Sequence, residues 1–244
     1  MLDFSKSMSM KSKLHVRNIP LEEIDNICTY ELPKGVKLKD FIVEENENSQ
    51  KYCLLGIGGG GLNLVESISK NRPNYHTMMA HIDYDDLDKR KCENKLYLLS
   101  DVEEREILTV DNKQALSAFV KGHKQLYIIA TFGRETHRCE AVEMIVKYLH
   151  RIGREITLIV IKPFLFEVVP GRIRAINESI KKLEAYTQKI VVFHNEDLLS
   201  IKEKSDMSMP EVFSTFDDVV RLTIEENKVY SSEQVVNVNL RDLM

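Results

Sequence analysis

The glycine-rich stretch at residues 52–63, which reads YCLLGIGGGGLN, constrains the fold of this chain more than any other part of the sequence. A short apolar run enters four consecutive glycines, and the chain leaves through Asn63 into LVESISK, which has helical spacing. Glycines let backbone N–H groups come close to a bulky anion, and a following helix adds the positive end of its dipole. The pattern predicts a phosphate cradle, with a tight strand-to-helix turn that holds no ligand as the alternative.

The same glycines also fit a second motif. Gly56, Gly58 and Gly61 satisfy G-x-G-x-x-G, and Asp83 ends the next apolar run. This combination is the fingerprint of a dinucleotide-binding turn, in which a carboxylate contacts a ribose. Asp83 equally suits the N-cap of a helix. The glycines alone leave open whether the ligand is a nucleoside triphosphate or a dinucleotide.

From residue 51 onward, apolar runs alternate with helical patterns, which is typical of βαβ units and a parallel sheet. LYIIAT and TLIVI are apolar throughout, as strands buried on both faces are. We therefore predict a three-layer α/β fold, in which helices cover both faces of a mostly parallel, Rossmann-like sheet. The predicted strands are 52–56, 77–82, 95–98, 126–131, 157–161 and 189–193, and the predicted helices are 62–70, 112–122, 138–152, 171–187 and 209–227.

Composition excludes several classes of function. The net charge is −4 at pH 7 and the basic residues are dispersed, which argues against binding to nucleic acid. No apolar run approaches the roughly 20 residues of a membrane span, so we expect a cytoplasmic protein without membrane insertion. The four cysteines form no C-x-x-C pair, which argues against a zinc ribbon or a disulfide framework. No metal site is predicted.

Residues 1–50 are expected to form a partly disordered N-terminal extension. Residues 1–13 are polar and lack a period, residues 29–32 and 38–43 have the character of short strands, and residues 44–50 form an acidic linker. Nothing in this segment indicates chemistry.

Two motifs further along the chain narrow the choice of ligand. The fifth predicted strand runs into KPFLFE at 162–167, followed by Arg172, and the sixth runs into NEDLL at 195–199. The chain resembles the FtsZ/tubulin family of GTP-dependent filament proteins, whose bacterial cell-division members carry T-K-P-F-x-F-E-G, then an arginine, then I-P-N-D-x-L-L. The resemblance covers residues 51–244. It implies the nucleotide-binding domain of that family, ending after the central helix, with the C-terminal domain absent.

The resemblance implies a guanine-nucleotide site. The glycine run would line the phosphates, Glu167 and Arg172 would contact the ribose or the base edge, and Asn195 would hydrogen-bond guanine. Phe213 would stack on the base, and Asp217 would accept from its N–H groups, which agrees with the donors and acceptors on guanine. The implied nucleotide-binding residues are Gly58, Gly59, Gly60, Gly61, Asn63, Asp83, Gly133, Thr136, Glu167, Arg172, Asn195, Phe213 and Asp217.

Two departures from the family pattern bear on hydrolysis. The family signature G-G-G-T-G-T-G aligns with GRETHRC at 133–139, which keeps Gly133 and Thr136 but introduces side chains where the phosphates would lie. The loop N-x-D-x-x-D, which acts in the neighbouring subunit, reads NVNLRD here. Asp242 keeps one carboxylate, whereas Asn239 cannot act as a base. A GTPase activity would therefore be weak or absent.

Three functions stay open at this point. The first is a GTP- or GDP-binding protein, with Mg²⁺ as a possible companion, that associates with itself or with other FtsZ-like cell-division or cytoskeletal proteins. The second is a nucleotide-free pseudo-GTPase scaffold that binds a protein partner. The third is a Rossmann-type NAD-binding protein.

Overall fold

The computed structural model describes residues 52–98, 108–132, 136–169, 171–225 and 233–242, with only the backbone for 136–139 and 242. The expectations for residues 1–50 and for Gly133 lie outside the described residues. From β1 to β6, the described strands and helices largely alternate, as the sequence predicts.

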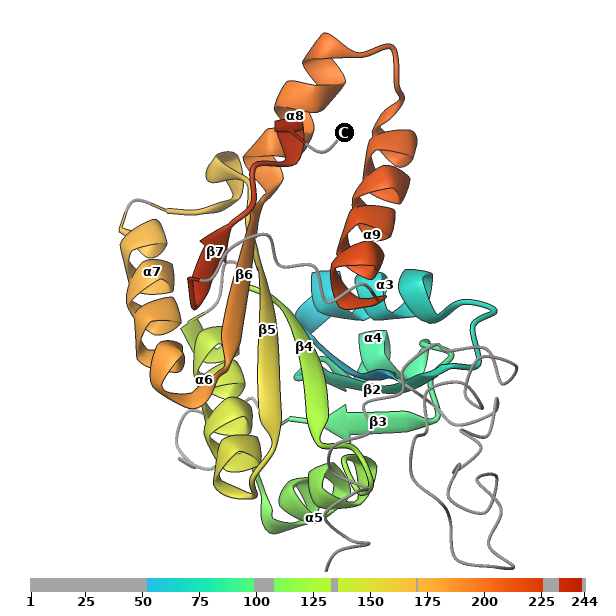
Figure 1. The fold of residues 1–244 in the computed structure, drawn as a ribbon, viewed down its shortest axis with the longest axis vertical. Coiled ribbons are helices and arrows are strands. Elements are labelled where there is room, and N and C mark those ends of the chain that lie inside the picture. Colours follow the sequence, from blue (N-terminus) through green and yellow to red (C-terminus); the bar gives the residue numbers. More distant parts are fainter. Residues whose placement is uncertain (1–51, 99–107, 133–135, 170, 226–232, 243–244) are drawn as a thin grey trace, which may run out of the picture. The chain divides into compact units, whose positions relative to one another are not determined.

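The strands form one seven-stranded sheet in the order β3-β2-β1-β4-β5-β6-β7, and every neighbouring pair is parallel (Figure 1). Strand β4 lies at the centre and is buried on both faces, as its uninterrupted apolar sequence predicts. The strands are β1 (Tyr52–Ile57), β2 (Tyr75–His81), β3 (Asn94–Tyr97), β4 (Gln125–Thr131), β5 (Glu155–Lys162), β6 (Lys189–His194) and β7 (Val235–Asn237).

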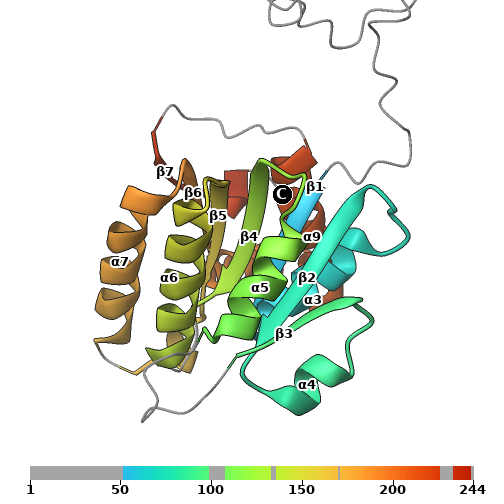
Figure 2. The same cartoon turned by 90° about the horizontal axis from the view of Figure 1, so that it is seen from below.

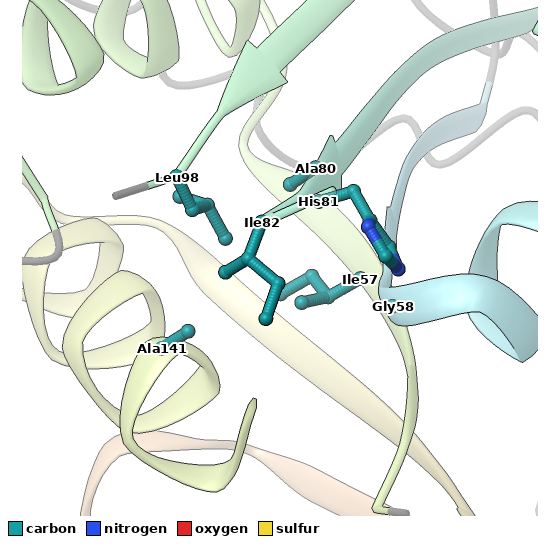
Figure 3. A pocket seen from close by; sticks show the side chains of 7 residues that line it. All are labelled: Ile57, Gly58, Ala80, His81, Ile82, Leu98 and Ala141. Carbon is teal, nitrogen blue, oxygen red and sulfur yellow. The ribbon is translucent and has the colours of Figure 1, made fainter. Parts of the chain in front are cut away.

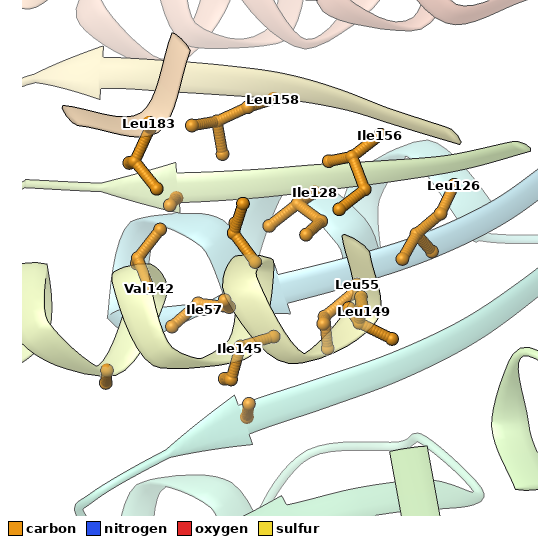
Figure 4. Packing of buried hydrophobic residues seen from close by; sticks show 14 of the residues in the cluster. Leu55, Ile57, Leu126, Ile128, Val142, Ile145, Leu149, Ile156, Leu158 and Leu183 are labelled. Atoms are coloured by element: carbon orange, nitrogen blue, oxygen red, sulfur yellow. The ribbon is translucent and has the colours of Figure 1, made fainter. Parts of the chain in front are cut away.

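Helices cover both faces of the sheet (Figures 1 and 2). One face carries α5 (Val110–Phe119), α6 (Thr136–Arg151) and α7 (Arg172–Leu183), whose apolar residues pack on the sheet. Figure 4 shows this packing for Val142, Ile145 and Leu149 of α6 and Leu183 of α7. The other face carries α3 (Gly58–Ser69), α4 (Tyr84–Asp88), α8 (Asn195–Lys204), α9 (Met209–Glu225) and the 3₁₀ turn η4 (Leu240–Asp242). Two further 3₁₀ turns, η2 (Leu165–Glu167) and η3 (Glu184–Tyr186), flank α7.

The predicted α/β fold is confirmed, and its six predicted strands match β1 to β6 within two residues at each end. Three elements were missed. Strand β7 has only three residues, α4 only five, and α8 is polar along most of its length, so none gives a clear apolar period.

The predicted start of the first helix at residue 62 was wrong, because the glycine run forms the first turn of α3. Gly58 enters the helix with φ 75°, a left-handed conformation that favours glycine. A Cβ atom on Gly60 would collide with the side chain of Thr131, and one on Gly61 would lie 2.5 Å from the carbonyl oxygen of Ile129 in β4. These glycines therefore let α3 lie directly against the central strand.

Replacement of Gly61 by alanine should lower the free energy of unfolding by about 1–3 kcal/mol, because the added methyl group meets backbone that cannot move aside. Gly59→Ala is the matched control, since a Cβ at Gly59 meets no described atom closer than 4.0 Å and alanine favours the helix. Denaturant unfolding of both variants measures the difference. Equal stabilities for the two variants would contradict this packing.

Candidate functional site

The first turn of α3 presents backbone donors at the carboxyl end of β1. Among the described residues, no side chain caps this helix, because the N-cap residue is Ile57. The first four N–H groups of a helix have no partner within the helix. The space beside Gly59 is open, with Oδ2 of Asp86 the nearest described atom, 4.0 Å from the Cβ position. Packing does not require a glycine at this position, which leaves room for a ligand to approach the backbone.

A group of charged side chains borders this turn. Arg90, which follows α4, donates to Oδ1 of Asn63 at 2.7 Å, to Oε2 of Glu66 at 3.1 Å and to Oδ1 of Asp86 at 2.9 Å. Oδ2 of Asp86 also lies 4.0 Å from Nε2 of the buried His81. The predicted phosphate ligand Asn63 thus belongs to a network that joins α3 to α4.

Asp83 has a structural role in this network. Its carboxylate accepts the N–H of Asp86 at 3.1 Å and so caps α4, while its own N–H donates to Nδ1 of His81 at 2.8 Å. Capping is one of the two roles that the sequence allowed.

A cavity of about 10 Å³ lies between the ends of β1 to β3 and α6 (Figure 3). The ring of His81 lies on the Gly58 side, and most of the other lining groups are aliphatic. A space of this size holds about one water molecule. The cavity is lined by Ile57, Gly58, Ala80, His81, Ile82, Leu98 and Ala141.

Helix α9 brings Asp217 against α3. Its carboxylate lies near the hydroxyl of Ser67, a residue one helical turn after Asn63 on the same face of α3. Burial raises the pKa of Asp217, as does the neighbouring Asp218, while the Ser67 hydroxyl acts in the opposite direction. Phe213 lies one turn before Asp217 on α9 and is 40% exposed. The predicted base-binding pair therefore shares one face of α9, beside α3.

The loop after β5 is closed by Glu167. The N–H of Phe164 donates to Oε2 of Glu167 at 3.1 Å, and the N–H of Glu167 donates back to the carbonyl oxygen of Phe164 at 3.0 Å. The N–H of Leu165 donates to Glu196 in the first turn of α8. Phe166 stacks on Phe164 and is 75% exposed. Glu167 thus shapes its own turn.

The other predicted nucleotide-binding residues that the structure describes lie at the first residues of helices. Asn195, half-buried, begins α8 beside this loop. Arg172 is 7% exposed and begins α7, preceded by Gly171 in a left-handed conformation. Arg172 and Asp217 therefore belong to helices on opposite faces of the sheet. Thr136 begins α6, and only its backbone is described.

The segment with the N-x-D-x-x-D spacing is fixed to the sheet. Strand β7 pairs with β6, and the N–H of Val238 donates to the carbonyl oxygen of Val192 at 2.9 Å. Leu240 is fully buried, and Arg241 donates to Oδ1 of the buried Asp197 through Nε at 3.1 Å and Nη2 at 2.9 Å. The backbone of the predicted catalytic Asp242 ends the turn η4, and its side chain lies outside the described atoms.

Solved structures with the same architecture include the empty FtsZ dimer of M. jannaschii, with 18% identity and a TM-score of 0.57 over 81% of this chain. The structure of CetZ2 from Haloferax volcanii, solved as a GTPγS-bound protofilament, shares 12% sequence identity with this chain and has a TM-score of 0.58 over 75% of it. TubZ from Clostridium botulinum phage c-st gives 15% identity and a TM-score of 0.54 over 77%. The chain has the FtsZ/tubulin superfamily fold.

The chain spans only part of the length of these structures. It spans 60% of the FtsZ and CetZ2 chains and 67% of the TubZ chain. No protein-family model matches its sequence. Within the described residues, no helix is both long and apolar enough to cross a bilayer.

Sequence reasoning missed several residues that border the α3 turn and the last described turn. Arg90 and Asp86 stand four apart, a spacing that signals an ion pair on one helical face. The contacts of Arg90 with α3 and of Asp197 with Arg241 join segments far apart in sequence, and no local spacing indicates them.

Arg241→Gln should lower the free energy of unfolding by about 1–3 kcal/mol, because the buried Asp197 loses two charge-assisted hydrogen bonds. Amide hydrogen exchange at Val238 should become faster, since this segment would separate from β6 more often. The control is Arg174→Gln, which removes an exposed ion pair with Glu178 and should cost about 0.5 kcal/mol or less. Equal losses in the two variants would rule out a special role for the Asp197 contact.

Proposed function

We propose that this protein binds a guanine nucleotide, with its phosphates at the first turn of α3 and its base beside α9. The observation that carries the proposal is Gly59, whose Cβ position has Asp86 Oδ2, at 4.0 Å, as its nearest described neighbour, at the start of a helix that no described side chain caps. Such a turn offers N–H groups and a positive dipole end to an anion. The GTPγS-bound CetZ2 structure, which has the same fold, supports this ligand class.

The side chains around α3 and α9 suit guanine. The Asp217 carboxylate can accept from the N1–H and the amino group of the base, and Asn195 can supply both a donor and an acceptor. Phe213 offers a partly exposed ring for stacking. Within the described residues there is no cluster of three or more His, Cys, Asp or Glu side chains that could hold a metal ion, so Mg²⁺ would arrive with the nucleotide.

Hydrolysis is proposed to be weak or absent. Asn239 stands where the family loop has a carboxylate, and the segment that carries it is held by Asp197 and Arg241. We further propose self-association or association with other FtsZ-like proteins in cell division or the cytoskeleton. The dimeric FtsZ and the CetZ2 protofilament are the support for this.

A nucleotide-free scaffold is the second candidate function. Asp86 favours it, because its carboxylate stands 4.0 Å from the Cβ position of Gly59 and repels phosphate. Measurement of nucleotide binding separates the two candidates.

GTP and GDP should raise the melting temperature of the protein, because a ligand that binds only the folded state stabilises it. Gly59→Ala should fold normally and lose this shift, since its methyl group fills the space beside the turn. Thermal unfolding with and without 1 mM nucleotide, roughly 100 times a typical Kd, measures both effects. A wild-type protein that neither retains nor responds to either nucleotide would favour the scaffold.

Phe213→Ala should weaken GTP binding roughly tenfold through lost stacking. Leu222→Ala is the matched control, because Leu222 lies on the same helix with a similar exposure, 42% against 40%. Titration calorimetry with GTP and ATP gives the affinities and the base preference. Equal affinity for the two nucleotides would rule out Asp217 and Asn195 as guanine-binding residues.

A further inference from the structure

Three side-chain oxygens from two helices converge on one guanidinium group. Asn63 and Glu66 come from α3 and Asp86 from α4, and all three accept from Arg90 within 3.1 Å. The side chain of Arg90 is 18% exposed, against 39% for Glu66 and 35% for Asp86. Arg90 is therefore the least exposed member of this group and lies at its centre.

Arg90 fixes the orientation of the Asn63 amide. A guanidinium group has donors and no acceptor, so Asn63 has to present its oxygen to Arg90. The amide nitrogen of Asn63 is thereby left as a donor for a ligand. Without Arg90, the amide could rotate and offer either atom.

Arg90 also balances the charge beside the α3 turn. Asp86 approaches the Cβ position of Gly59 to 4.0 Å, while Glu66 lies further along α3 and shares Arg90 with it. An uncompensated carboxylate at the distance of Asp86 opposes the binding of a polyphosphate. Arg90 pairs with both carboxylates, so the turn can accept an anion despite Asp86.

We propose that Arg90 is a positioning residue of the nucleotide site: it directs the amide nitrogen of Asn63 toward the ligand and neutralises Asp86 beside the phosphates. This inference rests on the proposed binding of a guanine nucleotide at the first turn of α3. It predicts that dependence on Arg90 grows with the number of phosphates on the ligand.

The test compares GTP, GDP and guanosine by titration calorimetry in wild type, Arg90→Gln and Arg90→Lys. Arg90→Gln should lose GTP affinity by about tenfold or more, GDP affinity less and guanosine affinity least, because the loss is largely electrostatic. Arg90→Lys keeps the charge and should retain most of the GTP affinity. Asp86→Asn combined with Arg90→Gln should recover much of the loss, since the uncompensated carboxylate is gone.

Lys95→Gln is the matched control. It removes one cation that pairs with Asp88 on α4, without contact to Asn63 or Asp86, and should change GTP affinity less than twofold. If the wild type binds GTP, three results would overturn the role of Arg90 and leave the proposed function standing. They are an unchanged GTP affinity in Arg90→Gln, an equal loss of affinity for guanosine and GTP, and no recovery in the double variant. A wild type that binds neither GTP nor GDP would overturn the proposed function and this inference together.

Discussion

The close approach of α3 to the central strand β4 sets the geometry of this domain. It depends on Gly60 and Gly61, whose missing side chains let the helix turn lie against Thr131 and Ile129. Because the helix cannot move outward without losing this contact, its first turn is held at the carboxyl ends of β1 and β4. The position of Gly59, the network around Arg90 and the proximity of Ser67 to Asp217 all depend on that placement.

The glycines of this run thus have different structural roles, which the sequence alone does not distinguish. Gly60 and Gly61 serve packing, and Gly58 serves a left-handed backbone conformation. Only at Gly59 do the described contacts and the backbone conformation give no packing reason for a glycine. A motif of four glycines therefore carries less evidence for phosphate binding than its length indicates, and the evidence that survives rests on one position.

Two groups of charged side chains hold distant segments together in this domain. Near α3, Arg90 gathers an amide and two carboxylates, whereas near α8 the buried Asp197 holds Arg241 and so fixes the last described turn. Both groups join segments that are distant in sequence, 27 residues apart for Arg90 with Asn63 and 44 for Arg241 with Asp197. Each restricts a segment that the family resemblance connects with nucleotide chemistry.

The sequence by itself determined the three-layer α/β fold, because buried parallel strands and amphipathic helices each have a period that local residues carry. It also indicated which segments meet at the carboxyl ends of the strands. It could not reveal β7, since three residues carry no period and only pairing with β6 makes them a strand. Nor could it show that Arg90 engages Asn63 or that α3 begins at Gly58. Those features arise from contacts between distant segments, which only the tertiary structure decided.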